Sequence, residues 1–136
     1  MRVAGILALT ALAVLCGTAN AQPESLIRVG VINLTSQTVS PAELEILSDR
    51  LRVELHNTGE FTVVERERME DILGEQGFQL SGCVDTYCDI EAGRLLGAEK
   101  MVAGSVGKLG TVYTMSLRLV DMQTGALERT ELRRRS

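Results

Sequence analysis

The chain has 136 residues, with 14 Lys or Arg against 18 Asp or Glu, and its net charge is −4. Apolar residues make up 45% of the sequence and aromatic residues only 3%. This composition excludes a collagenous chain, a disordered chain and a strongly basic nucleic-acid-binding protein, and the length suits a single domain.

The first segment predicts export. Arg2 precedes an apolar stretch, 3–15, drawn only from Val, Ala, Gly, Ile, Leu and Thr, and Ala19 and Ala21 form an A-x-A site before Gln22. This order is typical of a secretory signal peptide. As a helix, the stretch would span about 20 Å, which is less than a hydrocarbon layer of about 30 Å. We therefore expect residues 1–21 to be cleaved and residues 22–136 to form a periplasmic domain.

Cys16 raises an alternative for the same segment, which is lipid attachment and outer-membrane association. A bacterial lipoprotein signal has a small residue before the cysteine, and this sequence has Leu15 there. Cleavage after Ala21 is therefore the preferred prediction, and lipidation stays open as the second one.

The mature part begins with a predicted strand and helix. The β-branched run 27–34 predicts a central strand that is buried on both faces. Ser40, Pro41 and Glu43 then supply an N-cap, a proline at the first helical position and an acid three residues after the cap, so a helix should begin there and end at Gly59. Its inward face is predicted to carry Leu44, Leu47, Leu51 and Leu55.

A second strand and two further helices are expected next. The strand covers 61–64, and the helix 67–76 ends at Gly77 and directs Met69, Ile72 and Leu73 inward. A polar loop is predicted at 81–89, before a short helix at 90–96.

The C-terminal part predicts three strands, 101–106, 112–120 and 127–132, joined by turns at 107–110 and 121–125. In the middle strand Tyr113, Met115, Leu117 and Leu119 alternate with Val112, Thr114, Ser116 and Arg118, which predicts one buried and one solvated face. The expected fold is a single α/β domain of two or three layers, with a mixed sheet and the order β-α-β-α-α-β-β-β.

Cys83 and Cys88 are the two cysteines of the predicted mature part. In an oxidising compartment such a pair predicts a disulfide, which contributes only ~2 kcal/mol because the closed loop is small. Two reduced thiols and a metal or redox role are the alternatives. The spacing C-x4-C without a second pair of ligands is a poor match to zinc sites.

Few other side chains point to chemistry. His56, the single histidine, is predicted to be solvated at a helix end. Lys108 lies among glycines, but the Walker spacing is missing, so Gly104, Gly107 and Gly110 predict turns.

Two charged stretches are also interpreted as structural. A solvated helix face is predicted for the stretch Glu65, Arg66, Glu67, Arg68, Glu70, Asp71. Arg133, Arg134 and Arg135 predict a strand end or tail, with contact to anionic lipid or an acidic partner as the alternative.

In combination, several segments resemble the CsgG-like family of curli-secretion channels. They are FTVVER at 61–66, EQGF at 75–78, the loop 81–88, the run from Leu96 through 102–107, and the turn 121–125, and the resemblance covers roughly residues 27–132. Similar domains occur in the N-terminal part of the TolB family, in FlgO-like flagellar envelope proteins and in lipoprotein activators of cell-wall synthases.

The resemblance implies an exported, non-enzymatic envelope domain that binds an envelope protein or assembles with copies of itself. It brings no catalytic residue, metal, cofactor, small-molecule substrate or nucleic-acid partner. The matched residues are implied to be structural: Glu65 and Arg66 close the second strand, Cys83 and Cys88 brace a loop, and Gly104, Gly107, Gly110 and Gly125 serve turns.

The predicted function is therefore that of an assembly or secretion adaptor, or of a ring-forming domain, acting through an exposed sheet edge, the helix faces and the cystine loop. A periplasmic ligand or glycan sensor, or a small hydrolase with an acid pair among Glu65, Glu70 and Asp71, is the alternative.

Overall fold

The computed structural model describes residues 25–79 and 85–135, with side chains through Glu128. The predicted signal peptide, Cys16 and Cys83 lie outside the described residues, so export, lipidation and the disulfide stay predictions. The described elements follow the order β-α-β-α-α-β-β-β, as predicted.

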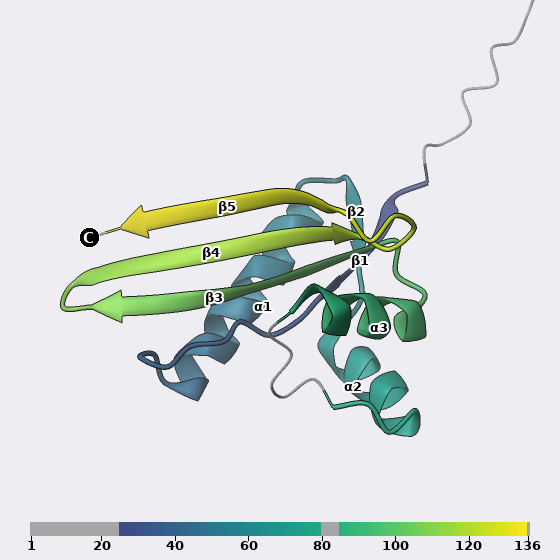
Figure 1. Ribbon diagram of the computed structural model, residues 1–136, viewed down its shortest axis with the longest axis horizontal. Coiled ribbons are helices and arrows are strands. Elements are labelled where there is room, and N and C mark those ends of the chain that lie inside the picture. Colours follow the sequence, from purple (N-terminus) through teal and green to yellow (C-terminus); the bar gives the residue numbers. More distant parts are fainter. Residues whose placement is uncertain (1–24, 80–84, 136) are drawn as a thin grey trace, which may run out of the picture.

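The strands form one mixed sheet. They are β1 (Ile27–Val31), β2 (Phe61–Val63), β3 (Lys100–Leu109), β4 (Val112–Asp121) and β5 (Leu127–Arg135). Their spatial order is β2-β1-β3-β4-β5, and β1 is parallel to both of its neighbours, whereas β3, β4 and β5 form an antiparallel meander. The sheet therefore has its two edges at β2 and β5 (Figure 1).

Helix α1 (Pro41–Asn57) covers one face of the sheet. The Ser40 hydroxyl accepts the Glu43 N–H, and the Glu43 carboxylate accepts the Ser40 N–H, so the predicted capping box fixes the helix start. The inward leucines are the predicted ones, and they pack on side chains of β1, β3 and β4.

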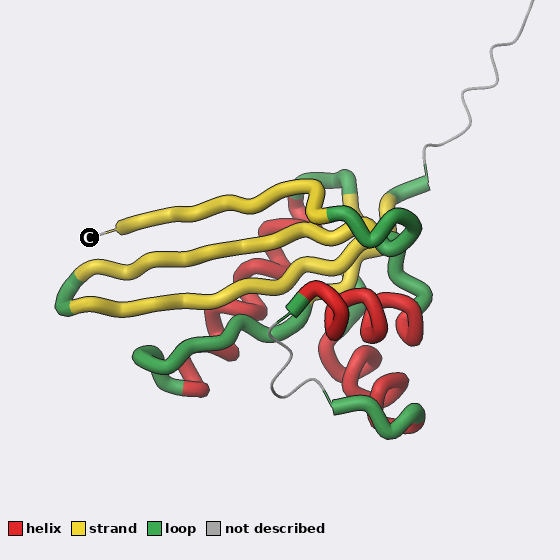
Figure 2. The backbone as a smooth tube through the Cα atoms, viewed as in Figure 1, coloured by secondary structure: helices red, strands yellow, loops and turns green. Residues whose placement is uncertain are grey.

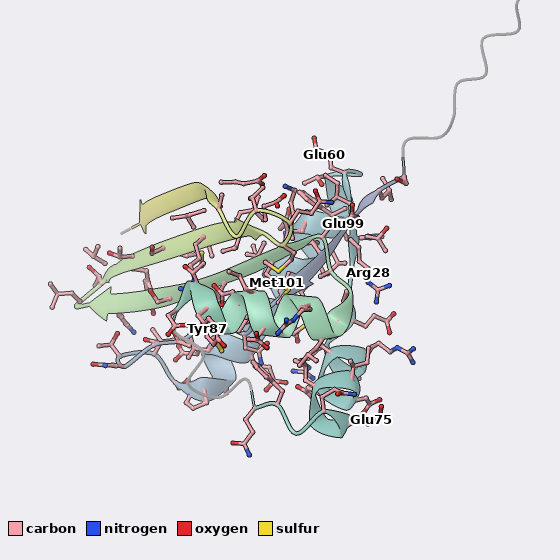
Figure 3. The ribbon with its side chains drawn as sticks, turned by 45° about the vertical axis from the view of Figure 1, so that its right-hand side comes forward. Arg28, Glu60, Glu75, Tyr87, Glu99 and Met101 are labelled. Carbon is pink, nitrogen blue, oxygen red and sulfur yellow. The ribbon has the colours of Figure 1, made fainter. Side chains whose placement is uncertain are left out.

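Helices α2 (Arg66–Glu75) and α3 (Thr86–Leu96) cover the opposite face, which makes three layers (Figure 2). Met69 and Leu73 of α2 and Leu96 of α3 form a cluster there with Met101, which has no exposed surface and lies beneath α3 in Figure 3. The alternation of β3 explains the two cores, because Met101 faces α3 whereas Val102 belongs to the cluster beside α1.

The structure corrects the predicted loop at 81–89. Helix α3 begins at Thr86, four residues earlier than predicted, because the Asp85 carboxylate accepts the Cys88 N–H at 2.8 Å and caps the helix. Cys88 therefore lies in the first turn of a helix.

The turn predicted at 107–110 begins later than predicted. β3 continues to Leu109, and the turn begins at Gly110. Gly104 and Gly107 lie inside β3 and pair with Leu117 and Thr114. A Cβ on Gly104 would be 2.4 Å from the Ser116 carbonyl oxygen, so this glycine serves a close approach of two strands. Gly110 and Gly125 do lie in turns, at φ 60° and 67°.

Candidate functional site

A groove runs along the β2 edge of the sheet. Its volume is about 590 Å³, and it lies between β2, the C-terminal half of α1 and the first turn of α2. Apolar side chains make up much of its wall, and two of them, Leu26 and Val53, are half exposed. We call it the edge groove, and it is lined by Leu26, Asp49, Arg52, Val53, His56, Phe61, Thr62, Val63, Val64, Glu65, Arg66 and Glu67.

The register of β2 explains why the groove borders an open strand edge. The Ile27 N–H donates to the Glu60 carbonyl oxygen, and the Val64 N–H donates to the Val29 carbonyl oxygen, so these backbone groups on either side of β2 face β1. Because amide groups alternate along a strand, the N–H and C=O groups of Phe61 and Val63 point away from β1. The groove floor therefore presents backbone groups that can pair with another extended chain.

A buried arginine, Arg52, is part of the wall of the groove. Arg52 is 8% exposed, and its Nη2 donates to the Val31 carbonyl oxygen at 2.8 Å and to Asn33 Oδ1 at 2.6 Å. Its Nη1 donates to Asp49 Oδ1 at 2.8 Å, whereas the buried Nε has no partner. Burial lowers the pKa of Arg52, and the neighbouring Asp49 carboxylate opposes this shift. The guanidinium thus ties α1 to the end of β1.

A second arginine, Arg66, also lines the groove. Arg66, the first residue of α2, pairs with Glu45 of α1, and lies 3.7 Å from Glu67 and 3.9 Å from Glu70. The hydrogen bond to Glu45 raises the pKa of Arg66. This arginine therefore joins α1 to α2, and the carboxylates of Glu65 and Glu67 stay exposed at the groove.

The groove brings together only some of the residues singled out from the sequence. Glu65 and Arg66 follow β2 and line the groove, while His56 lines it from the last turn of α1. Glu70 and Asp71, the other candidate acids for a hydrolase, are exposed on α2 and do not line the groove. The predicted solvated face of the charged stretch holds for Glu67, Glu70 and Asp71, which are exposed, whereas Arg66 is partly buried in its pair with Glu45 of α1.

Sequence reasoning missed a buried ion pair on the opposite face. Asp89 of α3 has no exposed surface and accepts from Arg118 Nε at 2.6 Å and from Nη2 at 3.1 Å. Arg118 was predicted to face solvent. The available signal was the spacing of Asp89 with Ala92 and Leu96, which places it on the inward stripe of α3.

Sequence reasoning also missed a lysine on β3 that pairs with carboxylates of β4 and β5. Lys100 Nζ donates to Glu128 Oε2 at 2.6 Å and to Asp121 Oδ2 at 3.2 Å. The bond to Glu128 is the main cause of the raised pKa of Lys100. The backbone N–H of Thr124 and then Lys100 lower the pKa of Asp121.

The described ranges 25–79 and 85–135 contain neither a membrane-spanning helix nor a metal-binding cluster. No helix in these ranges is long and apolar enough to cross a membrane. No group of three or more His, Cys, Asp or Glu side chains in the same ranges is placed to hold a metal ion.

Solved structures with the same fold come from several bacterial proteins. The LpoB C-terminal domain from Escherichia coli has a TM-score of 0.68 and 20% identity, over 81% of this chain and 82% of that one. Lipoprotein GNA1162 from Neisseria meningitidis has a TM-score of 0.65 and 13% identity, over 79% of this chain and 78% of the GNA1162 chain. The PelC dodecamer from Paraburkholderia phytofirmans has a TM-score of 0.53 and 16% identity, over 81% of this chain and 71% of the PelC chain.

Comparison with curated proteins found no match. The sequence does match one family over residues 11–116, which is most of the chain. The segments that resembled CsgG-like proteins lie largely within this range, and the fold agrees with them. The chain therefore belongs to the family described as curli production assembly/transport component CsgG.

Proposed function

We propose that this chain is an exported, non-enzymatic adaptor of the bacterial envelope, which binds an extended segment of a partner protein in the edge groove. The observation that carries the proposal is the position of the groove, with its volume of about 590 Å³, directly beside the open edge of β2. Family membership in an assembly and transport component supports it, as does the fold shared with envelope lipoproteins.

The chemistry of the groove specifies the partner segment. The outward N–H and C=O groups of Phe61 and Val63 can form main-chain hydrogen bonds with a strand, while the half-exposed Leu26 and Val53 can bury alternate apolar side chains. Arg66 already pairs with Glu45, so the exposed carboxylate of Glu65 favours a basic residue at the end of the segment near α2. The partner is thus an extended, apolar segment that carries a basic residue.

The experiment places a photo-crosslinking amino acid at Val53 in living cells. Val53 is 48% exposed and lines the groove. The matched control is Ile46, which is 69% exposed on the same helix but outside the groove. We expect an adduct from position 53 and not from 46, in which mass spectrometry identifies an apolar segment of another envelope protein. A Val53→Glu variant should abolish capture at a reporter placed at Leu26, whereas Ile46→Glu should not.

Two results would overturn the proposal. Equal adduct yields from positions 53 and 46 would show that the groove is not a binding site. An adduct between position 53 and a second copy of this chain would replace the adaptor role with self-assembly into a ring.

A further inference from the structure

The end of the sheet remote from the edge groove carries a concentration of positive charge. The hairpin residues 108–113 join β3 to β4, and the register of β5 places Arg133, Arg134 and Arg135 opposite Met115, Thr114 and Tyr113. We call residues 108–113 and 133–135 the basic tip. Its charged residues are Lys108 and the three arginines, and none is acidic.

The basic tip projects from the body of the molecule. Figure 1 shows the β3–β4 turn and the C-terminal end of β5 at the same end of the sheet, beyond α2 and α3. β3 and β4 are each ten residues long, which corresponds to roughly 30 Å of extended chain. The acidic residues of α2 lie toward the other end (Figure 1). The residues of the basic tip therefore include four cations and no acid, although the whole chain has a net charge of −4.

The side chains of the hairpin combine apolar, aromatic and cationic groups. Leu109 at the apex is 86% exposed, the highest value among the large apolar side chains that the structure describes. Tyr113 is 37% exposed, and the Lys108 ammonium lies 5.0 Å from the centre of its ring. Amphipathic aromatic rings beside lysine and arginine, next to a protruding leucine, are typical of segments at a membrane–water interface.

The shape of the tip favours a lipid surface over an acidic protein. The connection is a two-residue turn that begins at Gly110, so Leu109 stands on a convex apex. A stable protein interface buries about 800 Å² on each partner, which a narrow apex cannot supply alone. Anionic headgroups adapt to a convex cationic surface and allow an apolar side chain to enter.

We propose that the basic tip docks this protein on anionic phospholipid headgroups, with Leu109 entering the interfacial layer. This inference is independent of the edge groove and adds a lipid contact to the proposed protein contact. The two sites lie at opposite ends of the sheet, so one molecule can use both.

Vesicle binding of the mature chain, residues 22–136, tests the charge requirement. We expect sedimentation with vesicles of 30% phosphatidylglycerol in phosphatidylcholine, no binding to pure phosphatidylcholine, and loss of binding at high salt. Arg133→Gln with Arg135→Gln should weaken binding roughly 25-fold, or about five-fold for each charge. The control, Arg50→Gln with Arg94→Gln, removes the same charge from side chains that are 71% and 69% exposed elsewhere, and should leave binding unchanged.

A fluorescence measurement tests the role of the apex. The chain contains no tryptophan, so Leu109→Trp introduces a single indole. Its emission should shift to the blue with phosphatidylglycerol vesicles, whereas Ile46→Trp on α1 should show no shift. Circular dichroism confirms that each variant is folded.

Three results would overturn the lipid assignment. These are equal binding to both vesicle types, equal weakening by the control double variant, and an unshifted Leu109→Trp emission. Competition by soluble polyglutamate at equal charge concentration would assign the tip to an acidic protein partner, and competition by inorganic phosphate to free anions.

Discussion

The Asp89 carboxylate on α3 and the Arg118 guanidinium on β4 form a bidentate ion pair across the interface between helix and sheet. Both carboxylate oxygens accept from the guanidinium, at 2.6 and 3.1 Å, and Asp89 has no exposed surface. Geometry of this kind is typical of strong arginine–carboxylate pairs. The pair holds α3 against β4 beside the Met101 core.

Removal of one partner should destabilise the protein. Asp89→Ala leaves the Arg118 guanidinium only 23% exposed and without its carboxylate, and we expect a loss of about 3 kcal/mol in the free energy of unfolding. Urea denaturation measures this. Glu91→Ala on the same helix breaks the exposed pair with Arg94 and should cost below about 1 kcal/mol. Equal losses in the two variants would mean that the buried pair stabilises the protein no more than the exposed pair does.

Arg52 is predicted to be structural as well as part of the groove wall. Arg52→Met removes the donor to the buried Val31 carbonyl oxygen, which should lower the free energy of unfolding by about 2 kcal/mol. Arg50→Met, which breaks the exposed pair with Glu54, is the matched control and should change it by less than about 1 kcal/mol. Chemical denaturation of both variants checks the difference, and similar stabilities would contradict it.

The two glycines inside β3 should respond to alanine in opposite ways. Gly104→Ala places Cβ 2.4 Å from the Ser116 carbonyl oxygen, so β3 and β4 must separate, and we expect destabilisation by about 1–3 kcal/mol. A Cβ at Gly107 meets no atom within 4 Å, so Gly107→Ala should be neutral or stabilising by up to about 1 kcal/mol. Thermal unfolding of both variants decides, and a lower melting temperature for Gly107→Ala than for Gly104→Ala would refute this account.

Asp121 should give the stability a dependence on acidic pH. Its pKa in the folded protein is lowered by the Thr124 N–H and by Lys100, so its contribution is complete above the unfolded value of about 3.9 and is lost as the pH falls through the folded value. We expect the stability difference between the wild type and Asp121→Asn to be present at pH 6 and to shrink below about pH 4. Urea titrations at both pH values measure it, and a constant difference would argue against the assignment.

The predicted disulfide awaits a direct test. In protein purified from the periplasm, Cys83 and Cys88 should resist alkylation until a reductant is added, and a linked peptide should be found by mass spectrometry. Reduction should cost ~2 kcal/mol by the chain-entropy model. Alkylation of both thiols without reductant would instead support the free-thiol alternative.

The local chemistry of the sequence determined most of the fold. The Ser40 capping box and the leucine spacing of α1 each depend on residues close together in the chain, and both agree with the structure. The alternation in β4 gave the wrong exposure for Tyr113, which is exposed, and for Arg118, which is partly buried against Asp89. The start of α3 was misplaced because the capping role of Asp85 was not recognised within a polar segment. The role of Gly104 was missed because its neighbour, the Ser116 carbonyl, lies on another strand.

The sequence by itself determined the element order and the inward leucine face of α1, because periodicity, caps and turn residues are local properties. Only the tertiary structure decided which polar residues meet: the edge groove, the Asp89–Arg118 pair and the basic tip each join segments that are far apart in the chain. The physical reason is that strand order and register set these contacts. The sequence contains the residues that meet, but it does not show which strands lie side by side.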